Sequence, residues 1–150
     1  MLKLKNIKLV VIGLGYVGLP LAIEFSKKRK VLGFDINIDR IDKLNQNIDI
    51  NNEFSVDQLS GLKNICFTSD LNNSDNNCYI ITAPTPIDEF KKPNLYFLKN
   101  ATEIVSRILK KNDIVIYEST VYPGCTEEVC VPILEKGSSL KYNQGFLLWL

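Results

Sequence analysis

Three glycines near the N-terminus have the spacing of a phosphate-binding turn. The turn reads Gly13-Leu14-Gly15-Tyr16-Val17-Gly18. In such a turn the first glycine lets the chain leave a strand sharply, and the second leaves room for a pyrophosphate beside the backbone. The third lets the next helix pack closely on the strand. Free N–H groups at the start of that helix would bind the phosphates, so the motif predicts a dinucleotide site that includes all six residues.

An acidic residue follows at the distance that a dinucleotide-binding fold requires. The apolar residues 31–34 run directly into Asp35, whose carboxylate would accept hydrogen bonds from the adenosine ribose. The same negative charge would repel a 2′-phosphate, so we expect NAD rather than NADP. The alternative is a glycine-rich turn that binds nothing. The succession of strand, turn, helix, strand and acid argues against that alternative.

The pattern of apolar residues predicts the elements that would hold these groups. Nearly continuous apolar runs predict buried strands at residues 7–12, 31–34, 79–82 and 114–117, with a short strand at 65–67. Helical spacing predicts helices at 16–28, 38–44, 95–109 and 126–134, and a short helix around 56–59 is an alternative to a continuous loop. Asn37 would cap the second helix, and Pro132 would end or kink the last one. This alternation predicts a Rossmann-type α/β domain over residues 1–150, a doubly wound parallel sheet with helices on both faces.

Two more polar segments follow predicted strands. They read Ala83-Pro84-Thr85-Pro86 and Glu118-Ser119-Thr120-Val121. Ligands of doubly wound sheets bind outside the carboxyl ends of the strands. We therefore expect the glycine turn, Asp35 and these two segments to line one crevice.

Composition narrows the classes of function. The chain has 150 residues and a net charge of +1, which gives no electrostatic reason to expect nucleic acid or an anionic membrane as a partner. Histidine is absent and the four cysteines have no C-x-x-C spacing, so no metal site is expected. A reduced chain in the cytoplasm is the simpler interpretation of these four cysteines. Cys66 and Cys78 are expected to pack as small apolar side chains. Residues 9–23 superficially resemble a signal peptide, but their glycines and Pro20 fit the dinucleotide turn better.

Taken together, the motifs resemble the NAD-binding N-terminal domain of the UDP-glucose/GDP-mannose dehydrogenase family over residues 7–136. The matching pieces are the glycine turn with Leu19-Pro20-Leu21-Ala22, Gly33-Phe34-Asp35 with Arg40-Ile41, Pro84-Thr85-Pro86, and Glu118-Ser119-Thr120-Val121 with Pro123-Gly124-Cys125-Thr126. The amino-acid sequences of these segments are most similar to those of the bacterial UDP-N-acetylhexosamine 6-dehydrogenases, which make uronic acids for capsule and O-antigen (Vi-type) polysaccharides.

The resemblance implies roles for individual residues. Asp35 would hold the adenosine ribose, and Arg40 would lie near the same end, although Arg40 is alternatively a solvated helix residue. Pro84 and Thr85 would contact the cofactor through a rigid backbone. Thr120 would lie near the nicotinamide and help to place a catalytic water, or would alternatively only cap the end of its strand. Glu118 would be structural.

Family members oxidise a sugar CH₂OH to a carboxylate in two NAD-dependent steps, and full-length members are typically dimers. The resemblance places the catalytic cysteine beyond this domain, so Cys125 and Cys130 belong to the domain's own motif. A Ser-Pro-Glu motif is expected after residue 143, whereas this sequence ends in an apolar tail, residues 146–150, which is a sixth strand or out-of-frame sequence. We therefore expect a truncated NAD-binding portion that is inactive alone and meets a UDP-sugar only if the missing domain is supplied. The alternatives are a stand-alone NAD-binding or regulatory module and a non-functional gene remnant.

Overall fold

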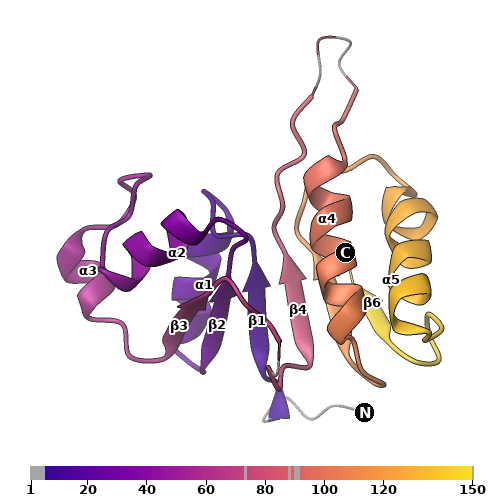
Figure 1. Ribbon diagram of the computed structural model, residues 1–150, viewed down its shortest axis with the longest axis horizontal. Coiled ribbons are helices and arrows are strands. Elements are labelled where there is room, and N and C mark those ends of the chain that lie inside the picture. Colours follow the sequence, from indigo (N-terminus) through magenta and orange to yellow (C-terminus); the bar gives the residue numbers. More distant parts are fainter. Residues whose placement is uncertain (1–5, 73, 88, 90–91, 150) are drawn as a thin grey trace.

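Short apolar strands build one parallel sheet in the computed structural model, which describes residues 6–72, 74–87, 89 and 92–149 (Figure 1). The strands are β1 (Leu9–Ile12), β2 (Val31–Phe34), β3 (Ile65–Thr68), β4 (Cys78–Ile81), β5 (Ile114–Tyr117) and β6 (Leu147–Trp149). Their order in the six-stranded sheet is β3-β2-β1-β4-β5-β6, and neighbouring strands are parallel. The order reverses between β1 and β4, which is the point where doubly wound sheets bind ligands. The predicted Rossmann-type fold is confirmed.

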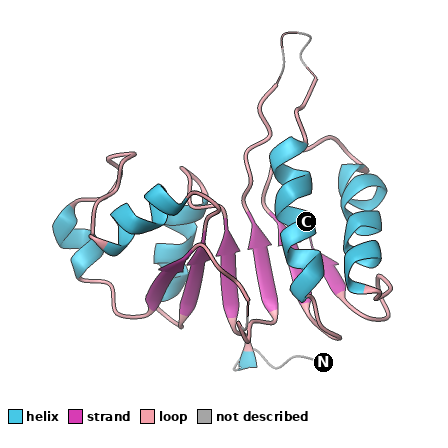
Figure 2. Ribbon diagram, in the orientation of Figure 1, coloured by secondary structure: helices cyan, strands magenta, loops and turns pink. Residues whose placement is uncertain are grey.

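Alternate side chains of the central strands pack into two separate apolar cores, one on each face of the sheet. Val10 and Ile12 of β1 point into one core, whereas Leu9 and Val11 point into the other. This alternation follows from the two-residue period of a strand. The helices are α1 (Gly18–Ser26), α2 (Ile38–Asn45), α3 (Val56–Ser60), α4 (Tyr96–Ile108) and α5 (Val131–Ser138). The first three pack on one core and the last two on the other, so the sheet lies between helical layers (Figure 2).

Local chemistry explains where the helices begin. The Asn37 side chain accepts a hydrogen bond from the Arg40 N–H at 3.1 Å, which confirms the predicted cap of α2. The short helix α3 is present and starts with a capping box between Ser55 and Gln58. Pro132 does not end the helical segment, which continues to Ser138. This proline lies in the first turn of α5, where a missing N–H is tolerated, and a π-helical turn at Thr126–Cys130 precedes it.

The strands at the two edges of the sheet bear on two further expectations, one for the apolar tail and one for the cysteines. Residues 147–149 form β6, and the Leu147 N–H donates to the Asp113 carbonyl at 2.9 Å. Leu147 and Trp149 on this strand remain exposed. Cys78 is buried on the central strand β4 as expected, but Cys66 is exposed on the edge strand β3, so the expectation that Cys66 packs inside is wrong. No helix in the described part of the chain is long and apolar enough to cross a membrane.

Candidate nucleotide site

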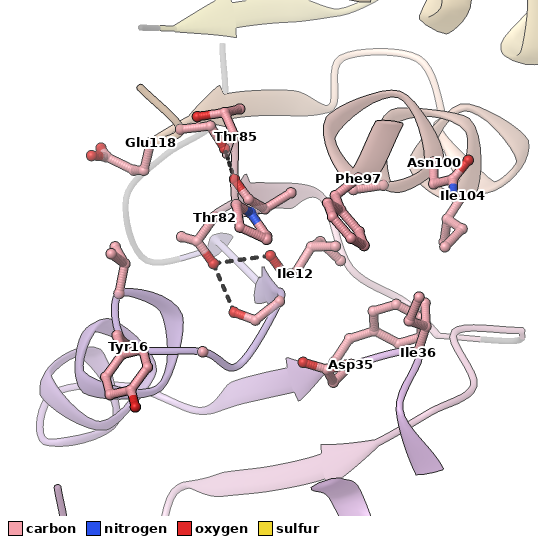
Figure 3. A pocket seen from close by; sticks show the side chains of 18 of the residues that line it. Ile12, Tyr16, Asp35, Ile36, Thr82, Thr85, Phe97, Asn100, Ile104 and Glu118 are labelled. Carbon is pink, nitrogen blue, oxygen red and sulfur yellow. Dashed lines mark hydrogen bonds between the residues drawn. The ribbon is translucent and has the colours of Figure 1, made fainter. Parts of the chain in front are cut away.

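A cavity of about 600 Å³ opens at the carboxyl ends of β1, β2, β4 and β5 (Figure 3). The predicted site residues that line it are Gly13, Gly15, Tyr16, Val17, Asp35, Pro84, Thr85 and Thr120. Leu14, Gly18 and Arg40 do not line the cavity and lie behind the glycine turn or in its helix. The fold thus brings the four predicted segments to one crevice, as expected for a doubly wound sheet.

The three glycines meet different demands. Gly13 has a φ of +95°, a left-handed conformation that side chains other than glycine rarely adopt. A Cβ atom on Gly18 would lie 1.7 Å from the Gly13 carbonyl oxygen, so the turn cannot close with a larger residue there. A Cβ atom on Gly15 would have no protein atom within 4 Å apart from those of Gly15 itself and its two chain neighbours. The fold therefore requires Gly13 and Gly18, whereas the space beside Gly15 is left open to the cavity.

The start of α1 offers donors to this open space. Among the described residues, the backbone N–H groups of Tyr16, Val17 and Gly18 have no hydrogen-bond acceptor. The first N–H of the helix that is paired belongs to Leu19, and it donates to the carbonyl oxygen of Gly15 at 3.1 Å. The first turn of α1 carries no acidic side chain. Unpaired N–H groups and the positive end of the helix dipole favour an anion at this position.

Asp35 lies at the other end of the turn, directly after β2. One carboxylate oxygen accepts the Leu14 N–H at 2.8 Å, and the other accepts the Asn37 N–H at 2.9 Å. Each oxygen keeps a lone pair for another donor. The carboxylate points into the crevice opposite Phe97 (Figure 3), where it can accept hydrogen bonds from a diol.

Arg40 does not point into the cavity. It is 4% exposed, so the alternative of a solvated helix arginine is wrong. Its Nε and Nη2 atoms donate to the Leu14 carbonyl at 3.0 and 2.9 Å, and its Nη1 donates to Asp49 at 2.7 Å. The predicted position of Arg40 near the adenosine ribose stays a prediction.

On the opposite wall of the cavity, side-chain hydroxyl groups form hydrogen bonds between the segments that follow β4 and β5. The Thr85 hydroxyl donates to the Thr120 carbonyl at 2.6 Å, and the Ser119 hydroxyl donates to the Ala83 carbonyl at 2.6 Å. Each bond joins the segment after β4 to the segment after β5. The Thr120 hydroxyl has no partner among the described residues and is free for a ligand. It does not cap its strand.

Sequence reasoning missed several contributors to the cavity, among them Thr82 and helix α4. The Thr82 hydroxyl contacts the carbonyl oxygens of Ile12 and Gly13 at 3.0 and 2.7 Å, which ties the end of β4 to the glycine turn. The helix α4 lines the wall with Phe97, Asn100, Ala101 and Ile104. Their spacing marks one face of the helix that was predicted at 95–109, and this face was the available signal.

The cysteine thiols are not placed for nucleophilic attack at this cavity. None of the four pairs in a disulfide, and none lines the cavity. Cys125 and Cys130 are fully buried, and burial raises the pKa of the Cys130 thiol. Burial also raises the pKa of Cys78 to about 11. A raised pKa keeps the buried thiols of Cys78 and Cys130 protonated and poorly nucleophilic.

Comparison with known proteins agrees with this geometry. Residues 7–148 match the family model described as the UDP-glucose/GDP-mannose dehydrogenase family, NAD binding domain. The chain is 54% identical to the UDP-N-acetyl-D-glucosamine 6-dehydrogenase of Pseudomonas aeruginosa, with 95% of this chain and 34% of the relative covered. It is 50% identical to the enzyme of the same name from Salmonella typhi, with 97% of this chain and 35% of the relative covered.

A solved structure, that of the UDP-D-ManNAc dehydrogenase of Pyrococcus horikoshii, superimposes with a TM-score of 0.82 at 30% identity. This match covers 95% of this chain and 35% of the other. The chain thus spans about a third of the length of the curated relatives that it matches. The match over nearly all of its length shows that the chain belongs to the UDP-glucose/GDP-mannose dehydrogenase family, as its NAD-binding domain.

Proposed function

We propose that NAD⁺ occupies the crevice with its pyrophosphate over the glycine turn. The N–H groups of Tyr16 and Val17 would bind the phosphates, with Gly13, Leu14 and Gly18 shaping the turn. The observation that carries this proposal is the open space beside Gly15, which the fold itself does not need. The ribose hydroxyls would donate to Asp35.

The remainder of the proposed site holds the nicotinamide end. The backbone of Pro84 and Thr85 would contact the cofactor, and Thr120 would lie beside the nicotinamide and help to place a catalytic water. The support is that all three line the same cavity as the glycine turn, and that the Thr120 hydroxyl has no protein partner in the described residues.

We propose further that this domain serves an enzyme that oxidises the CH₂OH group of a UDP-N-acetylhexosamine to a uronate for polysaccharide biosynthesis. Oxidation of a primary alcohol to a carboxylate removes two hydrides, one in each step, and consumes one water, so two NAD⁺ are reduced per sugar. The support is the identity of 54% and 50% to two UDP-N-acetyl-D-glucosamine 6-dehydrogenases.

The 150 residues alone would bind NAD⁺ without completing the oxidation. The support is that no cysteine lines the cavity, so a nucleophile for the aldehyde stage would have to come from elsewhere. Binding of the UDP-sugar and dimerisation are proposed for the whole protein and not for these 150 residues alone. A cytoplasmic setting is also part of it, and the unpaired thiols support that setting.

Isothermal titration calorimetry with NAD⁺ tests the first part of the proposal. We expect saturable binding by the chain and a weaker response to NADP⁺. Absorbance measurements with UDP-N-acetylglucosamine and NAD⁺ test the second part, with no NADH expected from these 150 residues. NADH formation by the purified chain would refute the idea that its chemistry depends on residues outside it, and absence of NAD⁺ binding would refute the cofactor site.

A further inference from the structure

A buried ion pair lies directly behind the glycine turn. The side chains of Arg40 and Asp49 are 5% and 0% exposed, and their Nη1 and Oδ1 atoms are 2.7 Å apart. Neither residue lines the cavity. Buried charges are expensive to keep unless every polar atom is satisfied, so such a pair needs an explanation.

On the Asp49 side, the carboxylate is fully occupied by the protein. Besides Arg40, its Oδ1 accepts the Asn51 N–H at 3.1 Å, and its Oδ2 accepts the N–H groups of Glu53 and Phe54 at 2.9 and 3.2 Å. These bonds fold the segment between α2 and α3 around one carboxylate. Asp49 is therefore a fixed anchor for the arginine and has no acceptor capacity left for a ligand.

On the Arg40 side, the guanidinium forms hydrogen bonds with one peptide group of the glycine turn, the carbonyl of Leu14. Two of its nitrogen atoms donate to the Leu14 carbonyl oxygen, while the Leu14 N–H donates to Asp35. The Leu14 side chain is fully buried. Leu14 is thus fixed through its N–H, its carbonyl and its side chain, and this residue sets the direction in which the backbone enters Gly15 and Tyr16.

We propose that Arg40 and Asp49 are positioning residues that hold the glycine turn in its phosphate-binding conformation, with Arg40 acting through the Leu14 carbonyl and not on the nucleotide. This inference rests on the proposed NAD⁺ site. Only a guanidinium can present two N–H donors to one oxygen and a third to a carboxylate from a rigid plane. A lysine has the charge but not this geometry, so charge and geometry can be separated by substitution.

The test uses the full chain and two readouts. The first is the hydrogen-exchange rate of the Leu14 amide, measured by NMR without nucleotide, relative to Ile80 in β4. The second is calorimetric affinity for NAD⁺ and for adenosine. For Arg40→Lys we expect Leu14 exchange to accelerate about tenfold and NAD⁺ affinity to fall about tenfold, with adenosine affinity unchanged. A merely structural role would change neither the Leu14 rate relative to Ile80 nor the ratio of the two affinities.

A charge-neutral variant guards against simple unfolding. Arg40→Met with Asp49→Asn removes both charges, so no unpaired buried charge remains, and the amide oxygen at position 49 can still accept backbone N–H groups. We expect this double variant to fold and still to show fast Leu14 exchange and weak NAD⁺ binding. Arg107→Lys, on the exposed side of α4, is the matched control and should change nothing.

Three results would overturn the inference. Equal losses of adenosine and NAD⁺ affinity in Arg40→Lys would mean that Arg40 contacts the nucleoside directly. Unchanged Leu14 exchange would mean that the arginine does not hold the turn. NAD⁺ binding by the double variant at wild-type strength would show that the pair is dispensable for the site. If the wild-type chain does not bind NAD⁺, the proposed function fails, and the exchange rates still decide whether the pair fixes the turn.

Discussion

At the scale of single residues, one glycine of the turn, Gly18, is required by the fold, whereas another, Gly15, is required only by the proposed ligand. Gly15→Ala places a methyl group in open space, so we expect an unchanged melting temperature but NAD⁺ binding weakened at least about tenfold, since the phosphate needs that space. Gly18→Ala drives a methyl group into the Gly13 carbonyl, so we expect a loss of about 3 kcal/mol or more in the free energy of unfolding. Calorimetry and thermal unfolding measure the two effects.

A third glycine serves as the control for this pair. A Cβ atom on Gly61 would lie 3.5 Å from the Asp57 carbonyl, an ordinary contact far from the cavity. Gly61→Ala should leave both binding and stability near wild type. If Gly15→Ala binds NAD⁺ as well as Gly61→Ala does, the pyrophosphate does not lie beside Gly15.

Asp35 carries the predicted discrimination between the two nicotinamide cofactors. Asp35→Asn removes the negative charge, so NAD⁺ affinity should fall roughly tenfold, because hydrogen bonds to charged groups contribute about 1.5–3 kcal/mol each. NADP⁺ should lose its repulsion and bind no worse than before. The ratio of the two dissociation constants, measured by calorimetry beside the exposed control Asp39→Asn, should move toward one. A constant ratio would contradict the proposed ribose contact.

Single residues also mark the limit of what the sequence predicts at the site. The spacing of Gly13, Gly15 and Asp35 placed them at one crevice because parallel strands bring their carboxyl ends together. The surroundings of Arg40 could not be read in this way. Its burial depends on Asp49, which folds back from a polar segment that carries no periodic pattern. Cys66 was misjudged because apolar neighbours do not reveal that its strand lies at an edge of the sheet.

At the scale of elements, the segment between α2 and α3 depends on one ionised side chain. Burial alone would raise the pKa of Asp49, but hydrogen bonds from Arg40 and from the N–H groups of Asn51 and Glu53 outweigh it and hold the pKa below its ordinary 3.8. A carboxylate with a lowered pKa in the folded state stabilises the protein above the unfolded-state pKa. This contribution disappears as the pH falls through the folded-state pKa.

Acid unfolding therefore tests this segment. We expect wild-type stability to fall below about pH 4, near the carboxyl pKa of the unfolded chain. Asp49→Asn should be less stable at neutral pH by about 3–5 kcal/mol, because Arg40 is left as an unpaired buried charge, and its stability should depend less on pH in the acid range. Denaturant unfolding at several pH values measures both. Parallel pH curves for the two proteins would rule out Asp49 as a source of the acid sensitivity.

Helix positions were more predictable than helix ends. The apolar spacing located α1, α2 and α4 because their buried faces repeat every three to four residues. The last helix runs past Pro132 to Ser138, because a proline can stop one helix or lie in the first turn of another, and the sequence does not say which. The π-helical turn before α5 lets the chain pass from Cys130 directly into the new helix.

At the scale of the whole molecule, NAD⁺ should stabilise the domain by mass action. A ligand that binds the native state alone adds about 2.7 kcal/mol at one hundred times its dissociation constant. For a domain of this size, that corresponds to a rise of roughly 5–10 °C in melting temperature. Thermal unfolding with increasing NAD⁺ should show this rise, and the Gly15→Ala variant should show a clearly smaller one at the same NAD⁺ concentration. An equal rise in both proteins would place NAD⁺ elsewhere on the molecule.

The whole fold was predictable for a simple reason. Alternating strands and helices allow few arrangements, because crossover connections between parallel strands are almost always right-handed. The two apolar cores follow once alternate strand residues face opposite helical layers. The cavity wall from α4 was not predictable in detail, because it depends on how Phe97 and Ile104 of that helix sit over the sheet.

The pairing of β1 with its two neighbours also sets the order in which a growing chain can build the sheet. β2 is a single helix away, but the other partner, β4, begins at Cys78, and the Lys8–Asn77 hydrogen bond beside that junction spans 69 residues. Synthesis from the N-terminus can therefore complete β3-β2-β1, the glycine turn and Asp35 while one edge of β1 still lacks its partner. Unpaired strand edges join other chains, so the time before β4 emerges from the ribosome is when this protein is most prone to aggregate.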